Sequence, residues 1–490
     1  MTEQQGRVTG EQGRVAREQG QVAREQGQVA REQGQVAREQ GQVTGGQGRL
    51  FRFLIYGLVL ASSAAQYAVV PILPVYAHRF GLSGLQQGMV LGATGLATLA
   101  VSLPAGVLSD RFGARRLTLW AGWLMSVALF AQALAGSFPV LLVARLGFGV
   151  GFAMVWTAGL AWLTEAAPGG PGLGGTVASA GAGSVVGPAL AGAAVQYFGL
   201  VSPFLAVAAG FAALTLALGL LRIRATAPAA PAARMGTSLR AAAADRRTIV
   251  AADAIVAAGG TTGVAALLVP AGLHAAGAPP GQIGLVFAAA GVLFVVASTL
   301  TTAAGRRAVS VPVVMAGLLA LALGLSPAIV TAAPLALVAM QCATTAARSV
   351  LWTVSYPLAA DGSERSGAGL GVVMGLLNGV WAATVLLGPL AAGLAADWLS
   401  AQAVFGLTAA ACLALLAVTV LVAGPCAARP GWPACRATTS SRAANSCRAG
   451  AGAGTADRPG PPVTRCPGRT GRRRRSRTGP AARGRTPPSW

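Results

Sequence analysis

The sequence contains no lysine, only two histidines and few charged residues of any kind. Charged side chains make up 10% of the 490 residues, whereas 54% are hydrophobic. Soluble domains carry about 25% charged residues, so this composition excludes a soluble globular protein and indicates a helical protein that crosses a membrane several times. The six cysteines lack C-x2-C spacing, and the sequence contains neither H-E-x-x-H nor G-x-S-x-G. We therefore expect no metal site, no cofactor and no enzymatic activity.

Basic residues are concentrated near the C-terminus. Fourteen arginines and one acidic residue follow Gly424, so this tail accounts for +13 of the net charge of +23. The high charge is therefore weak evidence for nucleic-acid binding, and we expect no nucleic-acid partner for the apolar core. Residues 425–490 are rich in Arg, Pro, Ser and Gly and are predicted to be disordered. They could bind anionic lipid or, with less support, nucleic acid, or they could arise from out-of-frame translation of a GC-rich gene.

Residues 1–52 form an N-terminal extension built on a seven-residue repeat, R-E-Q-G-Q-V-A. A heptad can form a coiled coil, but each repeat offers only two apolar residues and contains a glycine, which costs about 1 kcal/mol in a helix. We therefore predict disorder for this extension. The first apolar run starts near Phe53 and is long enough to span a membrane, so we expect no separate signal peptide.

From Phe53 onward the chain reads as twelve apolar segments of about 20–28 residues, each long enough to cross a hydrocarbon core of roughly 30 Å. The predicted fold is therefore all-α, with a six-helix bundle over 53–222, a polar linker over 223–248 and a second six-helix bundle over 249–424. The predicted spans are 53–77, 86–108, 117–136, 138–163, 173–198, 201–222, 249–272, 281–304, 309–331, 334–357, 367–394 and 401–424.

Arginines are distributed unequally between the two sets of connections. If the N-terminus lies inside the cell, the outer connections carry only Arg79 and the inner connections carry all the others, including Arg306, Arg307 and Arg365. Cytoplasmic loops of membrane proteins are enriched in basic residues. This asymmetry predicts an inner-membrane protein with both termini in the cytoplasm.

The two halves contain matching landmarks, which indicates an internal repeat. The segment Gly-Pro-Ala-Leu-Ala-Gly over 187–192 recurs as Gly-Pro-Leu-Ala-Ala-Gly over 388–393, which is 201 positions later. Arg145 and Arg348 are 203 positions apart, and Glu165 and Glu364 are 199 apart. Internal repeats of this kind are typical of secondary transporters.

A short basic loop joins the second and third predicted spans, with the pattern G-x-L-x-D-R-x-G-x-R-R. The glycines allow close approach and helix termination, and the charges hold the loop at a membrane surface. A plain basic anchor is one interpretation. The ordered pattern also resembles the signature loop of the major facilitator superfamily, whose members are twelve-helix transporters. The residues that carry this resemblance are Gly106, Asp110, Arg111, Gly113, Arg115 and Arg116.

The fourth span contains Arg145 at a predicted depth of roughly 10 Å. An arginine inside a membrane costs about 2.5–3.5 kcal/mol on insertion scales, so it is expected to face the protein interior or a wet cavity. Phe152 and Trp156 fall on the same helical face. The segment resembles the fourth-helix motif of proton-coupled members of the superfamily, although Phe148 replaces a usual polar residue. A structural role for Arg145 is the alternative. Glu165 closes this span and is either a surface acid or a partner of Arg111 or Arg115.

The fifth span carries small residues at four-residue intervals, which let two membrane helices pack closely. Its residues Gly183, Gly187, Pro188 and Gly192 closely resemble the fifth-helix signature of the drug:proton antiporters. That resemblance implies export of small compounds in exchange for protons. Close packing alone is the other interpretation.

Further polar and aromatic residues are candidates for a central site. Asp253 lies about 6 Å inside the seventh span, and Arg348 lies about 9 Å inside the tenth, so the two could form an ion pair. Asp253 could instead be a first-turn helix acid. The first span lacks the acidic residue seen in several antiporters, and its candidate polar residues are Gln66 and Tyr67. The remaining candidate residues for the cavity are Gln66, Tyr67, Trp156, Asn378 and Trp381.

The resemblance covers roughly residues 51–424. It implies a secondary transporter in the lipid bilayer, possible as a monomer, that exports small hydrophobic or cationic compounds with protons by rocking its two halves. One alternative is a sugar or metabolite facilitator or symporter, which an anionic substrate would favour because Arg145 and Arg348 are the deep charges. Another is a membrane-anchored binding protein that acts through its Arg-rich tail.

Overall fold

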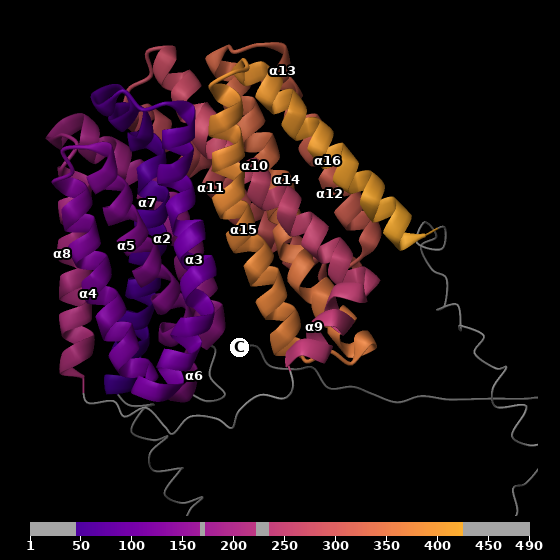
Figure 1. The fold of residues 1–490 in the computed structure, drawn as a ribbon, viewed down its shortest axis with the longest axis horizontal. Coiled ribbons are helices and arrows are strands. Elements are labelled where there is room, and N and C mark those ends of the chain that lie inside the picture. The colour runs from indigo at the N-terminus through magenta and orange to yellow at the C-terminus, as the bar shows by residue number, and fades with distance from the viewer. Residues whose placement is uncertain (1–45, 167–171, 222–234, 425–490) are drawn as a thin grey trace, which may run out of the picture. The chain divides into compact units, whose positions relative to one another are not determined.

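The computed structural model describes residues 46–166, 172–221 and 235–424, and in these ranges all regular secondary structure is helical (Figure 1). The described helices belong to one compact unit of the chain. The predictions of disorder for residues 1–45 and 425–490 concern parts of the chain outside the described residues.

The first half of the chain forms six membrane-length helical segments. The fourth segment is continuous from Phe138 to Ala166 but contains one π-helical turn, Val155–Gly159, between α5 and α6. The helices of this half are α2 (Gly46–Phe80), α3 (Gly84–Phe112), α4 (Ala114–Ala133), α5 (Phe138–Met154), α6 (Leu160–Ala166), α7 (Gly172–Phe198) and α8 (Ser202–Leu220).

The second half repeats this arrangement after a short helix, α9 (Met235–Ala244), which lies in the predicted linker. A 3-10 turn, Gly305–Arg307, joins α11 to α12. The helices of this half are α10 (Arg246–Ala275), α11 (Pro280–Ala303), α12 (Val311–Gly324), α13 (Ser326–Val330), α14 (Pro334–Ser366), α15 (Leu370–Ala396) and α16 (Ala401–Ala423).

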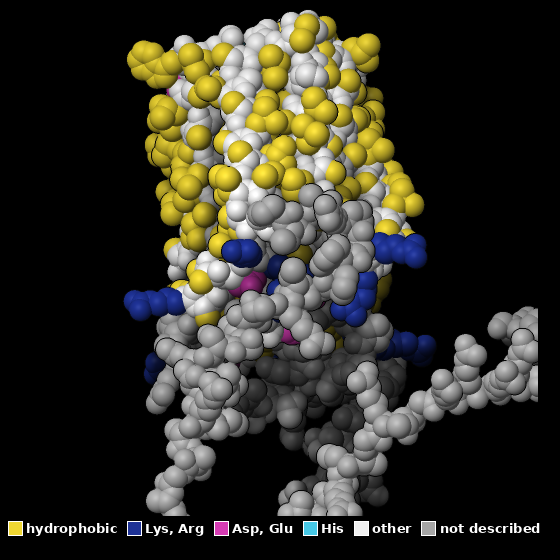
Figure 2. Space-filling model, turned by 90° about the vertical axis from the view of Figure 1, so that its right-hand side faces the viewer, with side chains coloured by type: hydrophobic (Ala, Val, Ile, Leu, Met, Phe, Trp, Pro, Cys, Tyr) yellow, Lys and Arg dark blue, Asp and Glu magenta, His cyan; other side chains and the backbone are white. Residues whose placement is uncertain are grey.

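Eleven of the described segments are long and apolar enough to cross a membrane. The helix α4 completes the predicted set of twelve. It has 20 residues, and Arg115, Arg116 and Gln132 lower its mean hydropathy. Figure 2 shows apolar side chains over the upper part of one face and arginines gathered toward the lower part. This distribution suits a protein whose sides contact lipid and whose charged end lies at a membrane surface.

Several predicted boundaries differ from the structure, three of them in ways that change the description of the chain. Residues 46–52 are helical, so the predicted disordered extension is wrong over this stretch. The tenth span continues from Tyr356 through Pro357 to Ser366 and ends at Gly367, which adopts φ +68°. A left-handed glycine is a common helix terminator. Part of the predicted linker is the helix α9, which contacts α10, α14 and α15.

The repeated Gly-Pro segments make equivalent contacts in the two halves. A side chain at Gly187 of α7 would collide with Ala64 of α2, and one at Gly388 of α15 would contact Gly260 of α10. At the ends of the same segments, Gly192 approaches Pro280 of α11 and Gly393 approaches Gly84 of α3. Each motif therefore packs its helix against the first helix of its own half and against the second helix of the other half. The internal repeat predicted from sequence is confirmed in these contacts.

The two halves meet along α3 and α15 and along α7 and α11. Figure 1 shows α3 beside α15. Close contacts of α15 with α3 extend from Gly393 to Ala382. Three further glycines of α15, nearer the end that carries the loop at Gly113, have no atom within 4 Å of the position of a side chain: Gly371, Gly375 and Gly379. The α3–α15 packing is therefore tight at the end remote from this loop and absent at these glycines.

Candidate functional site

The signature loop is a sharp turn between α3 and α4. Gly113 adopts φ +87°, a conformation that side chains disfavour, and its amide donates to the carbonyl oxygen of Ser109. Arg115 donates from Nη2 to the carbonyl oxygens of Gly219 and Leu221 at 2.9 and 3.2 Å. A guanidinium at the C-terminus of α8 stabilises the helix dipole. The loop therefore fastens two helices of the first bundle together.

The other signature residues lie near this turn. The side chains of Asp110, Arg111 and Arg116 are exposed, and the Arg111 guanidinium lies 5.5 Å from the centre of the Phe112 ring. Gly106 has open space where a side chain would begin. Glu165 lies in α6, but its side chain is outside the described part, so its predicted pairing with Arg111 or Arg115 stays a prediction.

Arg145 is completely buried on α5. Its Nη2 donates to the backbone carbonyl of Gln66 at 3.2 Å and to the side-chain oxygen of Gln66 at 3.1 Å. Thr94 donates to the same side-chain oxygen at 2.9 Å. The Nε and Nη1 atoms of Arg145 have no hydrogen-bond partner in the described chain. Arg145 therefore keeps two unused donors deep in the first bundle.

An aromatic row follows Arg145 along the fourth segment. The guanidinium lies 5.0 Å from the Phe148 ring centre, so the residue that departs from the family motif supplies a cation–π contact. Phe148 and Phe152 are 6.2 Å apart, and Phe152 and Trp156 are 6.0 Å apart. The common face predicted for Arg145, Phe152 and Trp156 agrees with this row. Trp156 stands at the π-helical turn and stays partly exposed.

Arg348 occupies the corresponding place in the second bundle. Its Nη1 donates to the hydroxyl of Thr262 on α10 at 2.9 Å, and its Nη2 donates to the hydroxyl of Thr345 one turn earlier on α14. The side chain is 7% exposed. Tyr67, the residue after Gln66 on α2, is partly exposed. Each deep arginine bonds the first helix of its own half, Arg145 at Gln66 of α2 and Arg348 at Thr262 of α10.

The predicted ion pair between Asp253 and Arg348 is wrong. Asp253 accepts a hydrogen bond from Thr419 of α16 at 3.3 Å, whereas Arg348 is held by threonines of α10 and α14. The helical rotation of α10 directs Asp253 toward α16, which contacts helices of the second bundle. The acid is therefore turned away from the first bundle.

A second aromatic group follows Arg348 on α14. Trp352 packs edge-on against Tyr356 at 5.5 Å and against Trp381 of α15 at 6.2 Å. The Tyr356 hydroxyl donates to the side-chain oxygen of Asn378 at 3.2 Å. Asn378 is exposed in the middle of α15, and Trp381 is partly exposed. These contacts bring two predicted cavity residues, Asn378 and Trp381, into one cluster.

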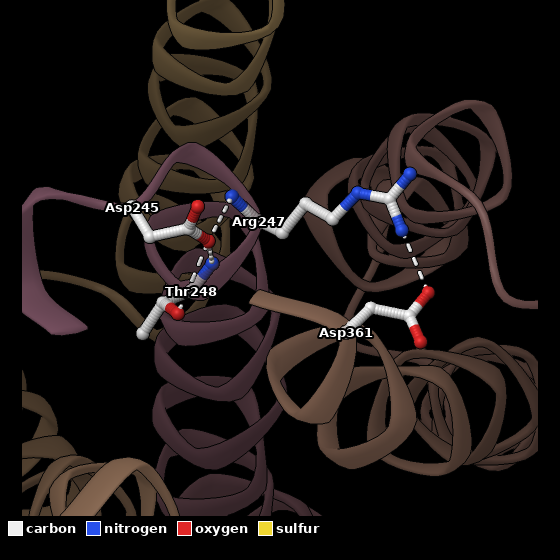
Figure 3. Close-up of polar contacts among 4 residues, drawn as sticks. All are labelled: Asp245, Arg247, Thr248 and Asp361. Carbon is white, nitrogen blue, oxygen red and sulfur yellow. Dashed lines mark hydrogen bonds and ion pairs between the residues drawn. The ribbon is translucent and has the colours of Figure 1, made fainter. Parts of the chain in front are cut away.

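Two carboxylates with structural contacts were not singled out in the sequence. Asp361 forms an ion pair of 2.6 Å with Arg247, beside Asp245, which accepts from the amides of Arg247 and Thr248 at the start of α10 (Figure 3). This is the one ion pair among the described side chains. Asp397 accepts from the amides of Gly84 and Leu85 at 2.6 and 3.0 Å. No local pattern marks these contacts because the partners are 114 and more than 300 residues apart.

The motif of the fifth span is positioned by packing. Gly183 faces α2, and a side chain there would collide with Leu60 and Ser63. The carbonyl of Pro188 lies against Gly284 of α11. The motif thus contacts both halves of the described chain.

Comparisons with known proteins agree with this architecture. A family model described as Major Facilitator Superfamily matches residues 55–267. The uncharacterized MFS-type transporter YuxJ of Bacillus subtilis (strain 168) is 33% identical over 155 residues, which are 30% of this chain and 39% of that protein. Quinolone resistance protein NorA of Staphylococcus aureus is 33% identical over 94 residues, which are 19% of this chain and 24% of NorA. The chain therefore aligns with less than half the length of these relatives.

Solved structures match over a longer part of the chain. A bacterial homologue of the human lysosomal transporter Spinster, in an inward-facing and occupied conformation, aligns with a TM-score of 0.63 and 15% identity, covering 78% of this chain and 96% of that one. The nucleoside transporter NupG aligns with a TM-score of 0.61 and 14% identity, covering 76% and 99%. At these identities the likeness establishes the fold alone.

Proposed function

Because the chain belongs to the Major Facilitator Superfamily, a family of membrane transporters, we propose that it exports small amphipathic compounds in exchange for protons. The observation that carries this proposal is the pair of equivalent contacts between the halves, α3 with α15 and α7 with α11. Two bundles that meet through symmetric, glycine-lined contacts can rock against each other around a central site. The close contacts of α15 with α3 lie toward one end of α15, and its glycines toward the other end lack them, as a rocking movement would require.

The direction of export is supported by the fifth-helix motif and by the relatives. Gly183, Gly187, Pro188 and Gly192 lie in α7 at the contact with α2 and α11. NorA is named for quinolone resistance. We place the signature-loop end in the cytoplasm, because the arginines of the described loops gather there and cytoplasmic loops are basic. In this orientation the end of α15 that lacks close packing, at Gly371, Gly375 and Gly379, faces the cytoplasm, which is the side from which an exporter loads its substrate.

The proton-coupling part of the proposal has two candidate groups. Asp253 is the acid nearest the middle of a span, and Thr419 is its hydrogen-bond donor. Arg145, Gln66 and Thr94 form the polar network of the first bundle. Protonation of Asp253 would weaken its contact with α16, and a change at Arg145 would alter the contact with α2. Either change in helix packing would alter the contact between the two bundles.

A metabolite facilitator or symporter is the second candidate function. The observation that favours it is the charge of the deep residues Arg145 and Arg348, which suits anionic metabolites. The two candidates differ in direction and in proton movement, and both use the same central site.

The test is transport by the full chain in everted membrane vesicles energised to an acid interior. We expect a panel of lipophilic dyes to accumulate and to release protons. An ionophore that collapses the pH gradient should stop accumulation, and Arg145→Ala and Asp253→Asn should each reduce it. Transport that is indifferent to the pH gradient would contradict proton-coupled export and favour the facilitator. Arg307→Ala, in the 3-10 turn outside the spans, is the matched control.

A further inference from the structure

Resting on the proposed transport function, we infer that the central site recognises organic anions: an aromatic compound whose carboxylate or sulfonate binds Arg348, with Arg145 adding a second positive charge. This assignment reverses the preference for cationic compounds that the sequence suggested. Four features of the described chain lead to it: the unused donors of Arg145, the bonds of the two arginines to the contacting helices α2 and α10, the missing counter-charge and the placement of the aromatic side chains.

The first feature is the incomplete bonding of Arg145. Its side chain is fully buried, yet Nε and Nη1 have no partner among the described residues. A buried cationic group with unpaired donors is costly, and a negative charge bound nearby offsets part of that cost. Gln66, the residue that holds Nη2, is itself partly exposed. A ligand could therefore approach this network at the Gln66 side.

The second feature is that the two arginines bond a pair of helices that pack against each other. Arg145 bonds Gln66 of α2, and Arg348 bonds Thr262 of α10. The helices α2 and α10 are the first helices of the two bundles and contact each other. Each bundle therefore contributes one deep positive charge, held on one of these two contacting helices.

The third feature is the absence of a carboxylate at this place in the described chain. Asp253 bonds Thr419 on α16, and Asp361 bonds Arg247 at the start of α10. The partners of Arg348 are the neutral hydroxyls of Thr262 and Thr345. A cationic substrate would face two positive charges without compensation. An anion would form charge-assisted hydrogen bonds, which are the stronger kind.

The fourth feature is the position of the aromatic side chains. Trp352 and Tyr356 follow Arg348 at intervals of one and two turns on α14, and Phe152 and Trp156 follow Arg145 on the fourth segment. Both rows therefore lie between the arginines and the signature-loop end. Arg348 retains 7% exposure, and Trp352 is partly exposed. An aromatic acid can place its ring against these side chains and its acid group at Arg348.

The test compares three ligands that share one ring: 2-naphthoate, 2-naphthamide and 2-naphthylmethylammonium. Binding of each tritiated compound to the purified full chain is measured by equilibrium dialysis. We expect naphthoate to bind about 10- to 100-fold more tightly than naphthamide, as charge-assisted hydrogen bonds imply, and the ammonium compound to bind most weakly. Equal or tighter binding of the amide or the ammonium compound would overturn the inference.

The variants separate charge from structure. Arg348→Gln should lower the affinity for naphthoate to about that for naphthamide, and naphthamide binding that is still measurable shows that the variant is folded. Arg348→Lys should retain part of the preference. Arg365→Gln removes the same charge from the exposed end of α14 and should change nothing. A preference that survives in Arg348→Gln would overturn the inference.

The transport assay distinguishes failure of the inference from failure of the proposed function. If the protein shows no preference for naphthoate over the other two compounds but still exports lipophilic dyes, the inference fails and the proposed function stands. If no compound binds and no dye is exported, the proposed function fails and the inference fails with it.

Discussion

The two joints between the bundles, α3–α15 and α7–α11, share their glycine pattern but differ in the residue that closes them. At the first joint, Gly88 lies against the carbonyl of Pro389. At the second, Gly284 lies against the carbonyl of Pro188. The first polar residue that follows these contacts along the chain is Asp397 at the first joint and Gln196, 201 positions earlier, at the second. One joint therefore ends in a carboxylate and the other in an amide.

The neighbouring helix starts explain this difference. Asp397 accepts from two consecutive amides, Gly84 and Leu85, at the start of α3. A carboxylate at a helix N-terminus is stabilised by unpaired amides and by the helix dipole. The helix α11 begins with Pro280, which has no amide hydrogen to donate, and Gln196 lies beside Gly281. We infer that the α3–α15 joint is held more strongly at its end than the α7–α11 joint.

The largest expected effect comes from filling the α3–α15 joint. Gly88→Leu would place a side chain against the backbone of Pro389, where neither backbone can move without shifting its helix. Overpacking of this kind costs about 1–3 kcal/mol or more. We expect a lower melting temperature in detergent and loss of dye export in vesicles. Gly375→Leu adds the same side chain to α15 where no atom lies within 4 Å. Gly375→Leu should leave the melting temperature unchanged. An equal loss of stability in both variants would show that the α3–α15 joint is not specially sensitive.

An intermediate effect is expected when the carboxylate of the first joint is neutralised. Asp397→Asn keeps the shape of the side chain but removes the charge that faces the start of α3, which should cost about 0.5–1 kcal/mol. Spin labels are placed at this end, one on each bundle, and the distance between them is measured by double electron–electron resonance. The variant should show a larger population of long distances. An unchanged distance distribution would show that Asp397 does not hold the joint.

The smallest effect is expected when the second joint is given the carboxylate of the first. Gln196→Glu introduces a charge beside Gly281, but Pro280 lacks the amide that a carboxylate would bind. We expect the free energy of unfolding to change by less than about 0.5 kcal/mol, because the new carboxylate gains only the weak interaction of an exposed charge with the dipole of α11. A stabilisation as large as the loss in Asp397→Asn would show that the two joints are equivalent and would remove the contrast between them.

The sequence predicted the fold well because apolar length and arginine placement depend on local composition. The twelve spans, the turn at Gly113 and the repeat around Pro188 and Pro389 follow from patterns that a few neighbouring residues define. The helix ends were less certain: Ser366 closes α14 nine residues beyond the predicted limit, because Asp361 and Arg365 are tolerated in a helix that extends past the apolar stretch.

The site was predicted in part. The positions of Arg145 and Arg348 inside apolar helices indicated that both are buried, but the rotation of each helix about its axis depends on packing across the whole bundle. For this reason Asp253 was expected beside Arg348 and instead bonds Thr419. Contacts such as that of Asp397 with Gly84 join residues over 300 positions apart, and only the folded structure brings them together.

The most direct test of the account is to fasten the α3–α15 joint and measure transport. Leu85→Cys and Trp398→Cys, placed beside the Asp397 contact on exposed positions in a cysteine-free chain, would be joined by a reducible bifunctional maleimide. If the bundles rock against each other, cross-linking should stop dye export in vesicles, cleavage of the linker should restore it, and each single-cysteine chain should be insensitive to the reagent. Export at the full rate with the joint fastened would contradict movement of the two bundles as the basis of transport.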